Sequence, residues 1–293
     1  MATFDVLERY LRGEYAAVPC AREADYYTVW HERGLDGMAA TDAALAGGLL
    51  ADRLPWVFTA GYQATLRNAF PALPAGGWAA FAATEDTHDR DAHPGTSLVE
   101  DADRCMLNGH KSWVAHSRCV DHLIVTVNDV DGDKRRARGL IIERSRSGVT
   151  LSHREQPGFL ASMSQGFAKF ENTPVVPGEV FEFAPIGLFG RTEAKFVMLA
   201  AAAFMLARAS IRSALQGRLF ATSGALLTLL GERETSRQVY AGIDREFQHC
   251  VDLFEQQVNT ATIVDYAADR RLLRMYTDKI QRRAEYAKQE ADA

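Results

Sequence analysis

Two short stretches of the sequence carry groups suited to holding a flat, ring-shaped cofactor. The first is an apolar run from Trp78 that ends at Thr84-Glu85, and the second contains Trp113. Backbone amides beside Thr84 could donate hydrogen bonds to ring carbonyls, and an indole offers a large flat face for a ring. Taken alone, Trp113 is better explained as an aromatic residue in the core of a β-hairpin.

The loop between these stretches carries four potential metal ligands, His88, Asp89, Asp91 and His93. No second ligand cluster with a clear spacing accompanies them, so the sequence favours the solvated rim of an active site and predicts no metal. Histidines at 110, 116 and 122 are interpreted as surface or hairpin residues, although His116 is close enough to the tryptophan strand to face a ligand. The sequence has no nucleophile elbow and no dinucleotide-binding glycine loop, so neither a hydrolase nor a Rossmann site is supported.

At 293 residues, with 47% hydrophobic and 24% charged residues, the composition is that of a soluble globular protein. The formal net charge of -5 argues against nucleic acid as the main partner, because phosphate binding needs a basic surface. The longest apolar stretch, 196–207, is about half of a bilayer span, and the N-terminus lacks the pattern of a secretory signal. We therefore expect a cytoplasmic protein with no membrane span. The 4 cysteines are widely scattered, which predicts free thiols.

The hydrophobic pattern predicts helices, then strands, then helices again. Helical spacing covers about the first seventy residues, with Pro55 opening one helix and Pro71 ending it. Short strands are predicted at 78–83, 96–99, 105–107, 112–115, 122–127, 139–143, 149–153 and 166–170. Asn108-Gly109 is predicted to form a two-residue hairpin turn, because a primed turn needs positive φ at both positions, and Asp131-Gly132 a second.

Helices are predicted after the strands at 192–219, 236–262 and 263–288. The alanines of the first of them should let neighbouring helices approach closely. We predict an α+β fold with an N-terminal helical domain at 1–75, a central antiparallel β-sandwich or barrel domain at 76–185, and a C-terminal helical domain at 186–293.

Several motifs of the β region, in the same order and spacing, resemble those of the acyl-CoA dehydrogenase family. Residues 83–91, with Ala-Thr-Glu and an Asp six residues after the Glu, resemble its A-x-T-E-P-x-x-G-S-D loop. Residues 107–115, Leu-Asn-Gly-His-Lys-Ser-Trp-Val-Ala, resemble L-N-G-x-K-x-W-I-T, and residues 120–125 resemble the A-D-x-x-x-V strand that follows. Residues 163–177 resemble the segment that leaves the sheet through F-x-x-V-x-V-P. The resemblance covers the middle third of the chain well and the helical flanks loosely.

The resemblance implies the fold of that family, with N-terminal helices, a central antiparallel β domain and a C-terminal helical bundle. It also implies FAD as the cofactor. Carried over by motif position, Phe81, Ala83 and Thr84 would line the flavin, and Trp113 would lie near its reactive side. The ordered set of motifs favours this role of Trp113 over that of a core aromatic.

The motif loop departs from the family pattern on the side of the cofactor phosphates. The family's Gly-Ser before Asp91 is Asp89-Arg90 here, and its Pro after the Glu is Asp86. An aspartate is unfavourable beside phosphates, whereas Arg90 could pair with one. The position of a pyrophosphate therefore stays open.

Two further departures concern the flavin contacts and the catalytic base. The family's Thr after the tryptophan is Ala115 here, with Ser117 as the candidate substitute. Full-length members have two more C-terminal helices, which carry a Gly-Gly segment and usually the catalytic Glu. Other members take this Glu from the first long C-terminal helix, where Glu193 is the nearest candidate base. The alternative is that Glu193 is an acidic residue in the first turn of its helix, favoured there by the helix dipole.

Two hypotheses follow from the resemblance. In the first, the chain is a short, divergent acyl-CoA dehydrogenase-like oxidoreductase that uses FAD for α,β-dehydrogenation of an acyl thioester, on CoA or a carrier protein, or of a related small molecule. In the second, it has lost the flavin chemistry and acts as a binding or partner subunit. Both predict an oligomer, because the apolar face of the 196–207 helix would otherwise be exposed. A homodimer or homotetramer is expected, with a hetero-oligomer containing a full-length homologue as the alternative.

Overall fold

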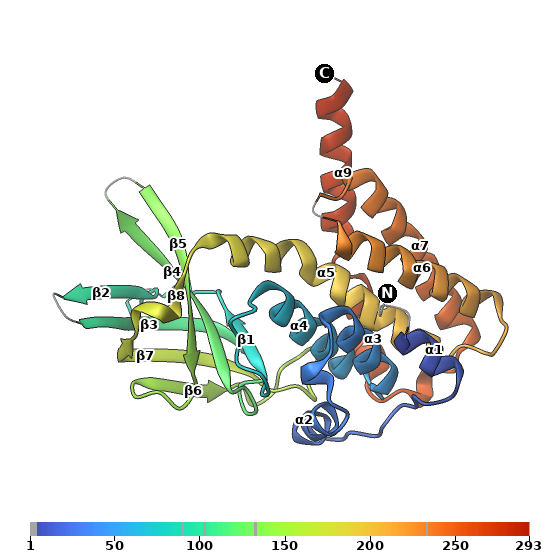
Figure 1. Ribbon diagram of the computed structural model, residues 1–293, viewed down its shortest axis with the longest axis horizontal. Coiled ribbons are helices and arrows are strands. Elements are labelled where there is room, and N and C mark those ends of the chain that lie inside the picture. Colours follow the sequence, from blue (N-terminus) through green and yellow to red (C-terminus); the bar gives the residue numbers. More distant parts are fainter. Residues whose placement is uncertain (1–4, 90, 102–103, 132–133, 233, 293) are drawn as a thin grey trace. The chain divides into compact units, whose positions relative to one another are not determined.

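The computed structural model describes residues 5–89, 91–101, 104–131, 134–232 and 234–292 (Figure 1). The elements before the first strand are α1 (Asp5–Leu11), α2 (Glu23–Glu32), the 3-10 helix η1 (Leu35–Gly37), α3 (Ala40–Leu50) and α4 (Leu54–Ala69). α4 has Pro55 in its first turn and ends before Pro71, as predicted from the two prolines.

The chain forms two compact units, which we call the β unit and the helical unit. The β unit comprises Ala21–Thr28 and Leu66–Arg191, and the helical unit comprises the chain up to Cys20, Val29–Thr65, and the chain from Thr192 onward. The division of the sequence into three domains at 75 and 185 stays a prediction.

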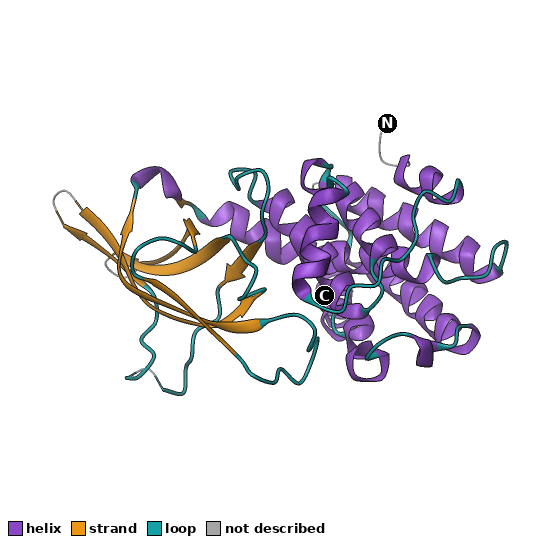
Figure 2. Ribbon diagram, turned by 90° about the horizontal axis from the view of Figure 1, so that it is seen from below, coloured by secondary structure: helices purple, strands orange, loops and turns teal. Residues whose placement is uncertain are grey.

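Two four-stranded sheets make up the β unit, in the orders β1-β4-β5-β8 and β2-β3-β7-β6 (Figure 2). The strands are β1 (Ala79–Ala82), β2 (Ser97–Asp101), β3 (Arg104–Ala115), β4 (His122–Asp131), β5 (Lys134–Glu143), β6 (Val149–His153), β7 (Gln165–Val175) and β8 (Val180–Phe181), with a 3-10 helix, η2 (Pro177–Glu179), before β8. Adjacent strands pair antiparallel except β1 and β4, which are parallel. This confirms the predicted α+β class with a largely antiparallel β region.

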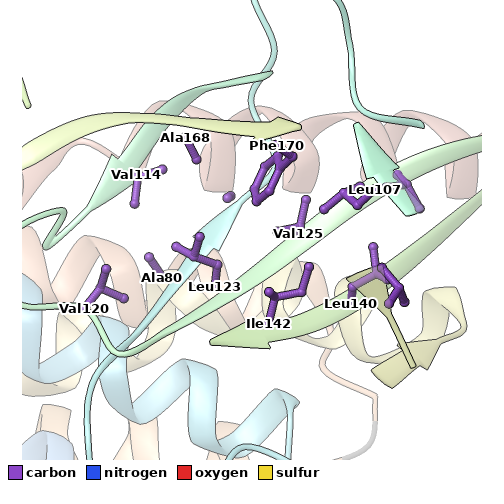
Figure 3. Packing of buried hydrophobic residues seen from close by; sticks show 13 residues of the cluster. Ala80, Leu107, Val114, Val120, Leu123, Val125, Leu140, Ile142, Ala168 and Phe170 are labelled. Carbon is purple, nitrogen blue, oxygen red and sulfur yellow. The ribbon is translucent and has the colours of Figure 1, made fainter. Parts of the chain in front are cut away.

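Apolar side chains from both sheets pack against one another in the core of the β unit (Figure 3). β4 contributes Leu123, Val125 and Val127, at the two-residue spacing of a strand that buries one face. The labelled partners from the other strands are Ala80, Leu107, Val114, Leu140, Ile142, Ala168 and Phe170. This core holds the end of β1 and the middle of β3, from which the candidate site is built.

The Asn108-Gly109 pair lies inside β3 and forms no hairpin turn, so that prediction is wrong. β3 is paired on both sides of it, and its register with β7 shifts between Leu107 and Gly109. Gly109 has a φ of 120°, and a Cβ there would lie 2.4 Å from the carbonyl oxygen of Gly95. Glycine is needed for this close approach of two backbones, and the irregularity bends the strand without reversing it.

The second predicted hairpin is present. β4 and β5 pair antiparallel along their length, with Asp131 opposite Lys134 at the turn end. Gly132, the predicted turn glycine, lies outside the described residues.

The helices after the strands differ from prediction in where the chain breaks. α5 spans Phe183–Leu206 and α6 spans Ala214–Gly231, so the single helix predicted at 192–219 is wrong. Ser213 begins α6 as an N-cap that accepts a hydrogen bond from Gln216 N. α7 (Arg237–Gln257) agrees with the predicted second helix apart from its end. The third is divided into η3 (Thr260–Thr262), α8 (Tyr266–Asp269), η4 (Arg270–Arg274) and α9 (Thr277–Asp292), with Asp265 left-handed at the break.

Within the helical unit, α3 and α4 pack on α5 with their backbones almost in contact. A Cβ on Gly48 would lie 2.2 Å from Ala200 O, and a Cβ on Gly61 would lie 2.5 Å from Val197 Cα. The close approach predicted for the alanine run is therefore present. Residues 196–206 are at most 4% exposed in the single chain, so the expectation that this helix shows an apolar face is wrong, and the oligomer stays a prediction without that argument. None of the described helices combines the length and apolarity needed to cross a bilayer.

We expect Gly61→Ala to lower the melting temperature, because its new methyl group collides with the α5 backbone, at a cost of about 1–3 kcal/mol. Gly217→Ala is the matched control: Gly217 is also helical, nothing lies within 4 Å of its Cβ position, and alanine is the better helix former by about 1 kcal/mol. Thermal unfolding of the two variants should move in opposite directions. Equal melting temperatures would contradict the close packing of α4 on α5.

Candidate functional site

The two motif stretches singled out in the sequence are joined by a backbone hydrogen bond. Ser112 N donates to Thr84 O over 2.8 Å, so the chain that leaves β1 lies beside β3 at the residue before Trp113. Thr84 is exposed, and its hydroxyl makes no hydrogen bond among the described residues. Trp113 is half-buried. A polar group and a broad aromatic face are thus neighbours on the same pair of segments.

The buried side chain of Lys111 holds these two segments together. Its side chain is 1% exposed, and Nζ donates to Glu85 Oε1 over 2.6 Å. Nζ also lies 3.4 Å from Ala83 O and 3.3 Å from Thr126 Oγ1, both of which accept from it. A single buried ammonium group therefore holds the residues on both sides of Thr84.

Glu85, which accepts a hydrogen bond from Lys111, also accepts bonds from Thr96 at the far end of the loop that follows it. The N–H and hydroxyl of Thr96 both donate to Glu85 Oε1, over 3.0 and 2.8 Å. Burial acts to raise the pKa of Glu85, but the bonds from Lys111 and Thr96 outweigh it and hold that pKa below its ordinary value. Burial lowers the pKa of Lys111, and Glu85 partly offsets this effect.

The Trp113 indole is fixed by a short chain of hydrogen bonds. Its Nε1 donates to Gln165 Oε1 over 3.3 Å, and Gln165 Nε2 donates to Phe159 O over 2.6 Å. The other tryptophans, Trp30, Trp56 and Trp78, are 0% exposed. Trp113 is therefore the tryptophan whose ring a ligand can reach.

The remaining residues predicted to bind the flavin differ in accessibility. Phe81 is half-buried against Phe189, with ring centroids 4.4 Å apart, and Ala83 is half-buried with its carbonyl held by Lys111. Ala115 and Ser117 are 0% exposed. Ser117 Oγ lies 2.9 Å from His153 Nδ1, so a contact from this hydroxyl to a ligand would require that pair to open. Their roles, and that of Arg90, which lies outside the described residues, stay predictions.

The loop that follows Glu85 is acidic where the family pattern has small residues. Asp86, Asp89 and Asp91 are all exposed or half-exposed, and Asp86 accepts from the N–H groups of His88 and Asp89. The rings of His93 and His110 meet edge to face at 5.3 Å. Among the described residues no three potential ligands lie together as a metal site would require.

The prediction that His116 is a surface or hairpin residue is wrong, because it is buried in the β unit in a pair with Glu23. His116, 0% exposed with a φ of 56°, has Nδ1 2.7 Å from Glu23 Oε1 and packs its ring 4.6 Å from that of Trp78. Ser164 donates to the same carboxylate through its N–H and its hydroxyl. Burial acts to raise the pKa of Glu23, but His116 and Ser164 outweigh it and lower that pKa. The pairing joins residues 93 positions apart, which no local pattern signals.

Glu193 belongs to the helical unit and lies midway along α5, not in its first turn, so the helix-dipole explanation for it is wrong. Burial raises the pKa of Glu193 to about 7, an effect that Lys279 and Tyr276 reduce. Its carboxyl therefore takes up and releases a proton near neutral pH, as a general acid or base must. Its assignment as catalytic base stays a prediction.

The residues at the ring end fit a flavin. Thr84 offers an exposed polar group, Trp113 offers an accessible aromatic face, and both are held by bonds on their inner side. At the phosphate end the described residues present carboxylates, which do not favour a phosphate group.

Several solved structures are similar to this chain in overall fold. Three of them are a FAD-dependent dehydrogenase (14% identity, TM-score 0.63, 94% of this chain and 96% of that one covered), the prolyl acyl carrier protein oxidase AnaB (14%, 0.59, 89% and 91%), and a probable acyl-CoA dehydrogenase from Mycobacterium abscessus (15%, 0.58, 93% and 91%). The chain matches no protein-family model and no curated protein sequence. The chain therefore has the acyl-CoA dehydrogenase-like fold, with a divergent sequence.

We expect Glu85→Gln to lower the free energy of unfolding by about 2 kcal/mol at neutral pH, because the charged bond from Lys111 is lost. The folded pKa of Glu85 lies below the unfolded one, so its stabilisation is present above about pH 4.3 and disappears as the pH falls through the folded pKa. Urea unfolding should therefore show the gap to wild type closing in acid. Glu155→Gln, which alters an exposed carboxylate of the same unit, should show no such gap.

Proposed function

We propose, from the acyl-CoA dehydrogenase-like fold and the joined Thr84 and Trp113 segments, that the protein is a flavoprotein that oxidises an acyl thioester or a related small molecule. The observation that carries the proposal is the hydrogen bond from Ser112 N to Thr84 O beside an accessible Trp113 ring. The structural neighbours include proteins described as a FAD-dependent dehydrogenase and an acyl carrier protein oxidase. The acyl group would be carried on CoA or on a carrier protein.

In this proposal the site would hold FAD, whose flavin would supply the hydride acceptor for α,β-dehydrogenation of the acyl group. Thr84 and Trp113 would hold the ring, with Phe81 and Ala83 beside them, Ala115 at the end of β3, and Ser117 in the turn that follows β3. Arg90 is the proposed partner of a phosphate. It is the only positive charge in the sequence between Asp86 and Asp91, where the carboxylates oppose an anion.

Glu193 is the proposed base that removes the α proton. A carboxylate with a pKa of about 7 is a stronger base than an ordinary glutamate, yet it is still half ionised at neutral pH. Its burial supplies this property without a neighbouring anion, since burial is the largest cause of the shift. Tyr276 and Lys279, which lower the pKa, stabilise the ionised form that accepts the proton.

The alternative is a family member without flavin chemistry that acts as a binding or partner subunit. The exposed carboxylates of Asp89 and Asp91, and the alanine at 115, favour it, because they remove groups suited to phosphate and flavin contacts. In either case we propose a cytoplasmic protein that assembles as a homodimer or homotetramer, or with a full-length homologue. The solution mass of the purified chain, alone and with such a homologue, tests the assembly.

The purified protein should bind FAD and shift the visible absorption bands of the flavin. Trp113→Ala should weaken binding by about tenfold or more, because the stacking face is removed, whereas Trp113→Phe should keep most of the affinity. Val99→Ala trims a 54% exposed apolar side chain on β2, which pairs with β3 at Met106, and serves as the control that leaves binding unchanged. Absence of bound flavin in the wild type, with and without added FAD, would exclude the flavoprotein and favour the partner subunit.

With an accepted acyl thioester, turnover should rise with pH through about 7, because the ionised form of Glu193 is the base. Glu193→Gln should slow oxidation by about 10²–10⁴-fold and remove this rise. Glu285→Gln, on the exposed side of α9, is the matched control. A pH profile of Glu193→Gln that keeps the same rise would assign the base to another residue.

A further inference from the structure

We propose that Lys111 is a positioning residue that sets the backbone of Thr84 for the proposed flavin contact, without touching the flavin itself. The inference rests on the proposed function and adds to it a residue that is not among the proposed flavin contacts. Its basis is geometric: the ammonium group is bonded to the residue before Thr84 and to the residue after it.

Lys111 cannot reach a ligand directly. Its side chain is 1% exposed, and its donors are directed to Glu85, Ala83 O and Thr126. A buried lysine costs several kcal/mol unless it is paired. Leu107 and Val114 of the same strand belong to the hydrophobic core of the β unit. The ammonium group itself lies among polar partners, Glu85, Ala83 O and Thr126.

The hydrogen bonds of Lys111 hold the chain on both sides of Thr84. Ala83 is held through its carbonyl, Glu85 through its carboxylate, and Thr84 between them through the carbonyl that accepts from Ser112 N. Lys111, Ser112 and Trp113 are consecutive on β3. On this strand Lys111 therefore bonds the loop through its buried side chain, Ser112 bonds Thr84 through its backbone N–H, and Trp113 carries the aromatic ring.

Glu85 and Thr96 connect Lys111 to the far end of the loop. Because Thr96 donates twice to Glu85, the two ends of the 86–95 segment are tied at the carboxylate that Lys111 neutralises. Thr96 Oγ1 also lies 2.8 Å from Thr126 O, so its one hydroxyl proton is shared between Glu85 Oε1 and this carbonyl of β4. Removal of the ammonium group would leave Glu85 without its counter-charge, and Thr84 would lose the support on both sides.

The test compares Lys111→Met with Leu140→Ala. Leu140→Ala destabilises the core of the same unit and leaves Lys111, Glu85 and Thr96 in place. Two quantities are measured: the amide exchange rate of Ser112 without flavin, and the dissociation constant for FAD. We expect Ser112 exchange to be about tenfold faster, and FAD binding about tenfold weaker, in Lys111→Met than in Leu140→Ala. Glu85→Gln, a milder change at the same pair, should shift both quantities in the same direction and stands in if Lys111→Met does not fold.

Equal changes in the two variants would overturn the proposal, because Lys111 would then act only through overall stability. Faster Ser112 exchange with unchanged FAD affinity would also overturn it, since the position of Thr84 would not matter to the cofactor. A wild-type protein that binds no FAD would overturn the proposed function and the flavin half of this inference. The exchange rates would still decide whether Lys111 holds Thr84.

Discussion

The candidate site depends on one buried charge. The Lys111 side chain is buried beside the hydrophobic core of the β unit, where an unpaired ammonium group would cost several kcal/mol. Its bond to Glu85 offsets this cost. The same bond fixes the chain that leaves β1 against β3 and closes the loop back to Thr96. Thr84 and Trp113, the proposed flavin contacts, therefore take their positions from β3 and from the bonds that Lys111 makes.

Close backbone contacts serve the same purpose in both units. Gly109 lets residues 95–96 lie on β3, and Gly48 and Gly61 let two helices lie on α5. In the helical unit residues 196–206 of α5 are buried, and Glu193, earlier on the same helix, is half-buried with its pKa raised to about 7 by desolvation.

The sequence predicts the order of helices and strands, the β4–β5 hairpin and the fold resemblance, because each depends on local periodicity or on motifs that keep their spacing. It fails where a distant segment decides the local conformation. Asn108-Gly109 has the composition of a turn, but the backbone at Gly95 makes it an irregularity in a strand. Glu85 and Lys111 both appear in the motifs, yet their pairing across 26 positions is visible only in the fold, and the Glu23–His116 pair has no motif at all. The break at Asp265 depends on a single left-handed residue that periodicity does not report.

The central claim, that a flavin lies against Trp113, is tested most directly by the indole N–H signals of the protein labelled at tryptophan. The chain has 4 tryptophans, of which three are 0% exposed and Trp113 is half-buried, so the signals report separate places. Addition of FAD should move the Trp113 signal, assigned by its loss in Trp113→Phe, and leave those of Trp30 and Trp56 in place. A spectrum in which FAD moves none of the signals, or moves others while Trp113 stays fixed, would contradict the account.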